Sequence, residues 1–374
     1  MNGERKIYRI GVIAGDGIGP EVVEATIPCV DAVADRFDFE MRWTHYDWGS
    51  QRYRRDGAMM PADGLDQLAG EEALLLGAVG APDIPDHVTL WGLLIPIRRG
   101  FHQYVNLRPV RLLPGVPSPL LDPGDLNLMI VRENVEGEYS EVGGRYNRGR
   151  PEEAAVQQSV FTRQGISRVA AFAARLAQGR RGLVTSATKS NGIIHTMPFW
   201  DEVVAETVFG HRGVQLESLL IDALAARLIL DPGRFDVIVA SNLFGDILSD
   251  LAAALAGSIG VAPSANLNPE GDHPSMFEPV HGSAPDIAGQ GSANPVGQLW
   301  AAAMMLDHLG ETEAAKTLTE AFETTLAAGV RTRDLGGRAS TLDFASEVER
   351  RCREEQRTDE QPASDGMVQP QDQR

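Results

Sequence analysis

Short apolar segments that suit β-strands alternate along the chain with segments whose apolar residues recur at helical spacing. The run YRIGVIAG at 8–15 precedes such a helical segment at 21–37, and further strand-to-helix units begin at residues 181 and 234. Strands that alternate with helices form largely parallel sheets with helices on their faces. The sequence therefore predicts an α/β fold, and its 374 residues are enough for two domains.

Three segments depart from this alternation. Residues 107–121 contain too much proline for a helix and suggest an extended connection. Residues 261–297 are rich in Pro, Gly, Asn and Ser, and a stretch of this length suggests a functional loop. From about residue 351 onward no apolar period is present, so we expect a disordered tail there.

The turn GDGIGP at 15–20 matches a dinucleotide-binding fingerprint only in part. The fingerprint has the spacing G-x-G-x-x-G and an acidic residue about 20 positions later at a strand end. Here the spacing is G-x-G-x-G, a proline follows, and Asp35 and Asp38 fall near an expected helix end. We interpret the segment as a tight strand-to-helix turn and predict that the fold is not a Rossmann fold.

The overall charge limits the kinds of partner. A formal net charge of −18 excludes a general binder of nucleic acid or of anionic membranes. No apolar run approaches the roughly 18 residues of a membrane-spanning helix, and the first residues lack the layout of a secretory signal. Cys29 and Cys352 form no metal or redox motif, so we expect a reducing, cytoplasmic location.

Lysine is rare in this chain, which makes each lysine informative. Of 34 basic residues only Lys6, Lys189 and Lys316 are lysine. Lys189 lies among small polar residues in TSATKSNG at 185–192. Lysine can lose its proton when burial or nearby charges disfavour the cation, whereas arginine stays protonated. This segment is therefore a candidate site for a catalytic base.

Two aspartates lie four residues apart in the expected helix NLFGDILSD. Asp246 and Asp250 should project from one face of that helix. Carboxylates placed in this way favour a cation between them, and Mg²⁺ or Mn²⁺ prefers such oxygen ligands. The alternative is that they stabilise the helix N-terminus, as first-turn acids often do. Asp222 could complete a metal site, but its spacing does not place it in space.

Arginines and one irregular segment are the other candidate binding features. Guanidinium groups bind carboxylates at two points, and three of them lie in or beside apolar segments, namely Arg98, Arg108 and Arg132. They bind either an anionic substrate or structural Asp and Glu residues. The segment EPVHGSAPDIAGQGSANP at 278–295 is either a ligand-binding loop or an ordinary surface loop, and its polar side chains are His281, Asp286 and Asn294.

Taken together, these segments closely resemble the β-decarboxylating dehydrogenases, the isocitrate and 3-isopropylmalate dehydrogenase superfamily. FGDILSD at 244–250 and EPVHGSAPDIAGQGSANP are the most specific matches, and the resemblance runs from about residue 7 to 350. PDHVTLWGLL, FHQYVNLRPVRL, ENVEGEYS and TSATKSNG are most similar to the branch of D-malate dehydrogenase (decarboxylating) and tartrate dehydrogenase.

The resemblance implies an isopropylmalate dehydrogenase-like fold of two domains, with a large mixed sheet and helices on its faces. Residues 1–103 and 258–354 would form a cofactor-binding domain. Residues 104–257 would form a central domain for substrate, metal and dimerisation, and residues 355–374 the tail.

The resemblance also implies a role for each matching residue. Lys189 would be the general base and Tyr139 the general acid. The ligands of Mn²⁺ or Mg²⁺ would be Asp222, Asp246 and Asp250. Residues at the substrate would be Arg98, Arg108, Arg132 and Asn191. Residues at the cofactor NAD would be His281, Gly282, Asp286, Ile287 and Asn294.

A carboxylate at Asp286 favours NAD over NADP, because it can accept a hydrogen bond from the ribose 2′-hydroxyl and repels a 2′-phosphate. The resemblance further implies a homodimer in which Lys189 and Asp222 reach the partner's site. Pairing of dimers into tetramers and activation by a monovalent cation are left open.

The implied reaction is metal-dependent oxidative decarboxylation of a small 2-hydroxy diacid by NAD. Trp91 stands where leucine-pathway enzymes have glutamate, and it fills space before the first substrate arginine. We therefore expect D-malate first and tartrate next, with 3-isopropylmalate dehydrogenase as the alternative. A non-catalytic regulatory subunit is a remote alternative, because the implied lysine, tyrosine and aspartates are all present. Val135, where the branch usually has threonine, and Pro96 depart from the pattern.

Overall fold

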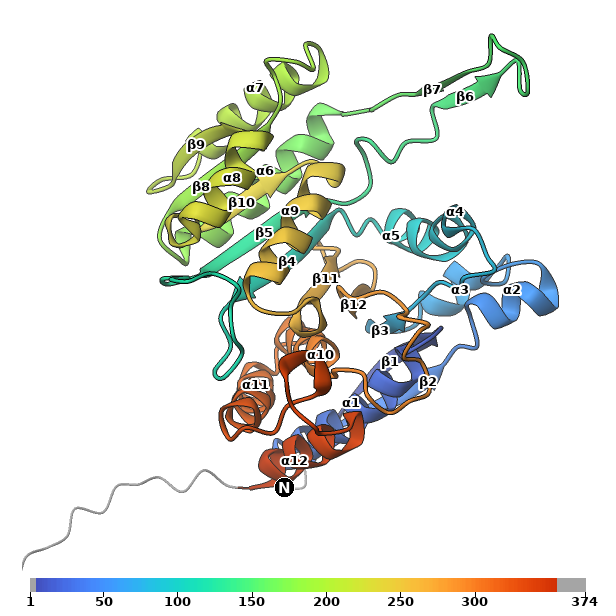
Figure 1. Cartoon of the computed structure of the whole chain (residues 1–374), viewed down its shortest axis with the longest axis vertical. Helices are drawn as coiled ribbons and strands as arrows, with labels where there is room; N and C mark the ends of the chain where they lie inside the picture. Colours follow the sequence, from blue (N-terminus) through green and yellow to red (C-terminus); the bar gives the residue numbers. More distant parts are fainter. Residues whose placement is uncertain (1–4, 355–374) are drawn as a thin grey trace, which may run out of the picture.

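The computed structural model describes residues 5–354, which form one large sheet flanked by helices (Figure 1). The ten strands lie in the order β2-β1-β3-β12-β11-β4-β5-β10-β8-β9. Their bounds are β1 (Lys6–Gly15), β2 (Phe39–His45), β3 (Ala73–Ala78), β4 (Val105–Arg111), β5 (Asn127–Glu133), β8 (Leu183–Thr188), β9 (Gln215–Leu220), β10 (Val237–Ala240), β11 (Pro263–Leu267) and β12 (Ser275–Pro279). The expected tail at 355–374 lies outside the described residues.

Helices cover both faces of this sheet. Segments from the two ends of the chain lie side by side, because α12 packs against α1 (Figure 1). The α-helices are α1 (Gly19–Arg36), α2 (Ser50–Asp56), α3 (Gly64–Leu68), α4 (Asp86–Thr89), α5 (Ile95–Gly100), α6 (Arg163–Gln178), α7 (Thr196–Phe209), α8 (Ile221–Leu230), α9 (Asn242–Leu255), α10 (Val296–His308), α11 (Thr312–Ala327) and α12 (Thr341–Arg353). In the described part of the chain, no helix is long and apolar enough to cross a bilayer.

The sheet contains two parallel groups of strands with an antiparallel centre. β2, β1, β3 and β12 are parallel to one another, and so are β5, β10, β8 and β9. β11 and β4 lie between the groups and pair antiparallel with both of their neighbours. The predicted α/β fold with a mixed sheet is confirmed. One sheet continues through both expected domains, and their division stays a prediction.

The prediction of a long loop at 261–297 is wrong for the first half of that segment. β11 and β12 form there and lie in the middle of the sheet. Their side chains alternate between the two faces, with Asn266 and Glu278 on one face and Ala265 and Phe277 on the other. The polar residues interrupt the apolar pattern of a buried strand, so the segment looks like a loop in sequence. The extended connection at 107–121 likewise begins inside β4.

The antiparallel centre of the sheet has one polar and one apolar face. Directly paired residues share a face, and Asn106 of β4 pairs with Arg132 of β5 and with Asn266 of β11. α9 covers this polar face, where its Ser249 accepts a hydrogen bond from Arg108 at 2.6 Å. The opposite face is apolar and lies against α6 and α10. The buried side chains of Asn106, Arg132 and Asn266 thus lie on the face of the sheet centre that α9 covers.

The turn between β1 and α1 packs against the loop after β12. Gly17 has φ +57°, and a Cβ atom there would lie 1.9 Å from the carbonyl oxygen of Ser283. The backbone N–H of Ile18 donates to the same oxygen at 2.9 Å. The glycine is therefore required by close backbone contact, which confirms the interpretation as a tight turn in a fold that is not of the Rossmann type.

A two-stranded hairpin extends away from the body of the molecule (Figure 1). It consists of β6 (Gly143–Tyr146) and β7 (Ala154–Gln157), which pair antiparallel. Tyr146 and Val156 are 56% and 47% exposed. Two isolated strands have little stability alone in water, so these apolar side chains are suited to a further contact.

Candidate active site

A cavity of about 160 Å³ lies between the polar face of the sheet, α5 and α9. The residues that line it include several expected from sequence to bind substrate, to donate a proton or to bind metal, namely Arg98, Arg108, Arg132, Tyr139 and Asp246. Leu90, Ile95, Arg99, Asn134, Val135 and Asn242 complete its lining. The structure thus brings together residues from four separate parts of the sequence.

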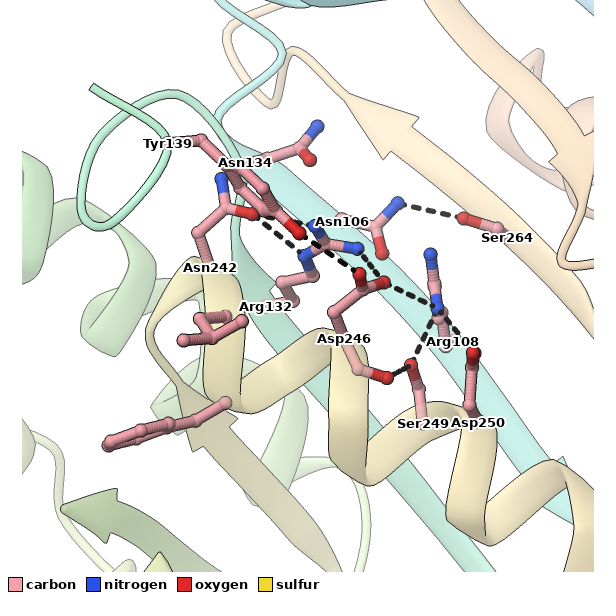
Figure 2. A network of polar contacts seen from close by, with 12 residues as sticks. Asn106, Arg108, Arg132, Asn134, Tyr139, Asn242, Asp246, Ser249, Asp250 and Ser264 are labelled. Carbon is pink, nitrogen blue, oxygen red and sulfur yellow. Dashed lines mark hydrogen bonds and ion pairs between the residues drawn. The ribbon is translucent and has the colours of Figure 1, made fainter. Parts of the chain in front are cut away.

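The two aspartates of α9 share one face of the helix, as predicted (Figure 2). Nη1 of Arg108 lies 3.4 Å from Oδ1 of Asp246 and 3.4 Å from Oδ1 of Asp250. Neither aspartate lies in the first turn of α9, so the alternative role at the helix N-terminus is wrong. Burial lowers the pKa of Arg108, and partial burial raises the pKa of Asp250.

The side chain of Arg132, on β5, reaches the carboxylate of Asp246. This side chain is 4% exposed and forms an ion pair with Asp246, and its Nη2 donates to Oδ1 of Asn242 at 2.6 Å. Burial, followed by repulsion from Arg108, lowers the pKa of Arg132 to about 10. The guanidinium is therefore still a cation at neutral pH, and the cavity retains a strong attraction for anions.

Arg98 is held by a buried network that continues into the sheet. Its Nη2 donates to Oε1 of Glu278 at 2.8 Å, and Nδ2 of Asn266 donates to the same oxygen at 2.7 Å. Asn106 donates to Oγ of Ser264 at 2.7 Å (Figure 2). The Nε atoms of Arg98 and Arg108 are buried without a hydrogen-bond partner in residues 5–354. Unpaired cationic donors beside a cavity suit an anionic ligand.

Tyr139 projects toward the carboxylates from the loop after β5 (Figure 2). Its hydroxyl donates to Oδ2 of Asp246 at 3.4 Å, and its ring centroid lies 5.9 Å from Cζ of Arg132. Burial, followed by repulsion from Asp246, raises the pKa of Tyr139, so the phenol keeps its proton at neutral pH. The preceding residue, Glu138, accepts hydrogen bonds from Ser241 and from the N–H of Leu243 at the start of α9.

Lys189, Asn191 and Asp222 lie apart from this cavity. Nζ of Lys189 is 2.6 Å from Oδ1 of Asp222, and the two side chains are 31% and 66% exposed. The hydrogen bond from Lys189 lowers the pKa of Asp222. Asn191 is also exposed, and none of the three lines the cavity within the described chain. Within residues 5–354 no three His, Cys, Asp or Glu side chains converge as a metal site, so one chain does not assemble the expected ligands.

A second cavity of about 450 Å³ collects the expected cofactor residues His281, Ile287 and Asn294. His281 is 9% exposed, burial lowers its pKa, and its Nε2 is buried without a partner in the described chain. The walls are mostly apolar, and they include Ile18, Ile259 and Ala284. A neutral ring with one free nitrogen and apolar walls suits a planar heterocycle such as adenine.

The remaining expected cofactor residues lie at the edge of this loop. Gly282 and Asp286 are exposed and do not line the cavity in the part of the chain described. Nδ2 of Asn294 donates to Oδ2 of Asp334 at 2.9 Å, and Ser258 donates to the same oxygen at 2.8 Å. Asp334 and Ser258 thus connect the loop to two other segments.

Residues 9–348 match the family model described as isocitrate/isopropylmalate dehydrogenase. The chain belongs to the isocitrate/isopropylmalate dehydrogenase family. It is 52% identical over 350 residues to a Bacillus subtilis protein named "Probable tartrate dehydrogenase/decarboxylase", with 93% of this chain and 99% of the relative covered. It is 50% identical over 353 residues to an Escherichia coli protein named "D-malate dehydrogenase [decarboxylating]", with 92% and 98% covered.

A solved structure supports the same assignment. The crystal structure of isocitrate dehydrogenase from Methylococcus capsulatus aligns with a TM-score of 0.85 at 32% identity, covering 93% of this chain and 100% of that one. The predicted resemblance and fold class are confirmed. The chain is an oxidoreductase of this family, whose curated relatives carry the names of decarboxylating dehydrogenases.

Several residues in or beneath the cavity of this dehydrogenase were missed in the sequence. Glu278, Asn134 and Asn242 bind the predicted side chains or the strands beneath them. Each lies near the end of a strand or at the start of a helix, where polar residues commonly serve a site. Arg99 was also missed, because Arg98 beside it drew the prediction.

Proposed function

We propose that this chain oxidises and decarboxylates a small 2-hydroxy diacid with NAD, with D-malate as the first candidate and tartrate as the next. The observation that carries the proposal is the small cavity in which four arginines, Tyr139 and Asp246 converge. Guanidinium groups suit the two carboxylates of a diacid. The names of the Bacillus subtilis and Escherichia coli relatives point to the same substrates.

A divalent metal fits the donors that lie in the cavity and beside it. Asp246 and Asp250 supply hard oxygen ligands on one helix face, and the partner's Asp222 would supply a third. A bound Mg²⁺ or Mn²⁺ would lower the pKa of the substrate hydroxyl and stabilise negative charge on the oxidised substrate. Arg108 and Arg132, which contact these aspartates, would then bind the substrate carboxylates.

The chain's own residues move the protons. The partner's Lys189 would take the proton of the C2 hydroxyl, and NAD, when bound, would accept the hydride that leaves C2. The bond from C3 to its carboxylate then breaks, CO₂ leaves, and the electron pair remains on the substrate. Tyr139 donates its hydroxyl proton to C3, which completes the product. Its raised pKa keeps that proton available at neutral pH.

A homodimer is part of this proposal, because one chain separates Lys189 and Asp222 from the cavity. Apolar side chains are exposed near both places along the chain, with Ile194, five residues after Lys189, at 67% and Ile247 of α9 at 54%. Ile247 directly follows Asp246, so a partner that covers it would come next to the cavity. The exposed hairpin β6–β7 offers a further contact.

NAD is the proposed cofactor. The second cavity, with its apolar walls and the free Nε2 of His281, would hold the adenosine half. Asp286 is exposed on the same loop, where its carboxylate would accept from a ribose hydroxyl and repel a 2′-phosphate. Residues 281–294 thus support both the binding of adenosine and the preference for NAD over NADP.

3-Isopropylmalate is the alternative substrate. Trp91 does not line the cavity within the described chain, and instead stacks on Arg99, whose Cζ lies 5.0 Å from the ring centroid. Arg99 does line the cavity. A cation at this wall disfavours an isopropyl group, since the apolar group would displace water from the guanidinium without replacing its hydrogen bonds.

The proposal is tested by following NADH absorbance with purified protein, NAD and Mn²⁺. We expect kcat/KM to be highest for D-malate, lower for tartrate and lowest for 3-isopropylmalate, with equal amounts of CO₂ and NADH. EDTA should abolish turnover and Mn²⁺ should restore it. A clear optimum on 3-isopropylmalate or a preference for NADP would contradict the corresponding part. Absence of NADH with every acid would favour the regulatory-subunit alternative.

A further inference from the structure

Two adjacent arginines of α5 have separate partners. Arg98 donates to Glu278 beneath the cavity, whereas Nη2 of Arg99 donates to the backbone carbonyl oxygen of Tyr139 at 2.7 Å. Successive residues of a helix point about 100° apart, so the pair can serve two walls of one cavity. Arg99 thus joins α5 to the loop of the proposed acid, a loop 40 positions further along the chain.

The contacts of Arg99 favour a single orientation of its guanidinium. The group stacks on the ring of Trp91, in the π-helical segment Leu90–Leu94 that precedes α5. Nη1 also lies 3.5 Å from Oε2 of Glu141, but that carboxylate is 74% exposed and adds little. The hydrogen bond to Tyr139 is charge-assisted and only partly exposed, so it is the stronger contact.

Three consecutive residues of the loop are held by three different segments. Glu138 binds the start of α9, the carbonyl of Tyr139 accepts from Arg99, and the hydroxyl of Ser140 donates to the carbonyl of Gln158. The backbone of Tyr139 is thereby fixed on both sides, while its side chain extends toward Asp246. Of these three contacts, the hydrogen bond from Arg99 is the one that Tyr139 itself makes, through its backbone carbonyl oxygen.

We propose that Arg99 is a positioning residue that sets the place of the Tyr139 hydroxyl, and that Trp91 orients Arg99 for this task. The inference rests on the proposed function for the role of Tyr139 as proton donor. Proton transfer requires close alignment, and a displacement of about 1 Å can cost roughly 100-fold in rate. Trp91 therefore acts on the reaction through Arg99 and not through contact with substrate.

The test compares Arg99→Ala, Arg99→Lys and Trp91→Phe with wild type. For Arg99→Ala we expect kcat to fall about 10- to 100-fold with the KM for NAD unchanged. Protonation of C3 should then limit turnover, so the deuterium effect on kcat with C2-deuterated substrate should shrink. Arg99→Lys should recover part of kcat, because an ammonium can also donate to the carbonyl. Trp91→Phe, which keeps a ring, should lose less than Arg99→Ala.

Arg163→Ala is the matched control. Arg163 also stacks on an aromatic ring, that of Phe199 at 5.3 Å, and pairs with two exposed carboxylates, but it lies at the start of α6 away from the cavity. Its loss should leave kcat and the deuterium effect unchanged. Hydrogen exchange of residues 137–142 should be faster in Arg99→Ala and unaltered in Arg163→Ala.

Several results would overturn the inference. A kcat of Arg99→Ala within two-fold of wild type would remove the positioning role. A raised KM for the diacid with unchanged kcat would make Arg99 a substrate ligand instead. Unchanged hydrogen exchange of the loop would refute the contact itself. If wild type turns over no acid, the proposed function fails, and the exchange comparison alone then decides whether Arg99 fixes this loop.

Discussion

At the scale of the residue, the cavity's attraction for anions depends on side chains that stay protonated when they are buried. Burial lowers the pKa of Arg132 only to about 10, so the guanidinium keeps its charge at neutral pH. A lysine in the same surroundings would lose its proton more readily. This explains why arginines line the cavity, while Lys189, the proposed base, is one of only three lysines in the chain.

Glu133, next to Arg132, is the buried acid with a strongly shifted pKa. It is 1% exposed and accepts hydrogen bonds from the N–H groups of Val135 and Glu136 at 3.1 Å and 2.8 Å. Burial is the largest cause that raises its pKa from 4.5 to about 7, and the hydrogen bonds from the backbone N–H groups of Glu136 and Val135 oppose this shift. The folded protein therefore binds this proton more tightly than the unfolded chain does.

The shift predicts a pH dependence of stability. The stabilisation from protonated Glu133 is fully present below about pH 4.5 and is lost as the pH rises through about 7. The free energy of unfolding, measured with urea, should fall between about pH 4.5 and about pH 8, and it should fall further in wild type than in Glu133→Gln. The difference should approach about 3 kcal/mol. Equal losses in the two proteins would show that Glu133 is ionised in the folded state.

At the scale of the element, the position of α9 depends on a close approach to β5. A Cβ atom on Gly245 would lie 2.6 Å from Cβ and 3.2 Å from Cα of Arg132. The absence of a side chain lets α9 lie against the strand, so that the next residue, Asp246, reaches Arg132 and Arg108. The distance between helix and strand thus sets the geometry of the acidic and basic groups.

Gly245→Ala should push α9 away from β5 and separate Asp246 from Arg132. We expect the variant to lose about 1–3 kcal/mol of unfolding free energy through overpacking. Its KM for the diacid should rise, because both arginines lose their fixed partner. Gly70→Ala, where nothing lies within 4 Å of the added Cβ atom, is the control and should leave both quantities unchanged. A variant with unaltered KM would show that the helix position does not matter for binding.

The elements differ in how far the sequence predicts them. The first strand, the turn at 15–20 and α9 follow from apolar periodicity and turn residues, and they lie where expected. β11 and β12 were missed, because Asn266 and Glu278 serve the polar face of a buried sheet and so break the apolar pattern. Sequence periodicity reports which side chains avoid water, and these side chains are buried for their hydrogen bonds instead.

The candidate site shows the same limit. Arg98, Arg108 and Arg132 were singled out by their apolar surroundings and Tyr139 by resemblance, and all four line one cavity in the structure. Their supporting partners were not identified, because Glu278 and Asn242 act through contacts between distant segments. The spacing of residues along the chain does not predict contacts between segments that are far apart in sequence.

At the scale of the whole molecule, the proposed site needs two subunits. The cavity holds Tyr139 and Asp246, while Lys189 and Asp222 form their own exposed pair in the same chain. In a symmetric dimer each cavity would receive the lysine of the other chain. Residues of one site would therefore be supplied by two chains.

Hybrid dimers test this arrangement. Lys189→Ala and Tyr139→Phe should each be nearly inactive alone. After subunit exchange between equal amounts, half of the dimers would be hybrids, each with one intact site, so activity should recover to about one quarter of wild type. Tyr139→Phe mixed with Asp246→Asn is the control, since both changes affect the same cavity of their own chain, leaving the other cavity with a mutant residue as well. Absence of recovery in the first mixture would place the lysine in the site of its own chain.

The antiparallel centre of the sheet has a mechanical consequence. β4 and β11 are hydrogen-bonded to each other and to the parallel strands on either side, so the two cavities proposed for substrate and cofactor are attached to one continuous sheet. Any approach of the two cavities must bend or twist these strands against their hydrogen bonds. Such a sheet would deform elastically rather than rotate about a hinge, and it would return to its original shape once the products have left.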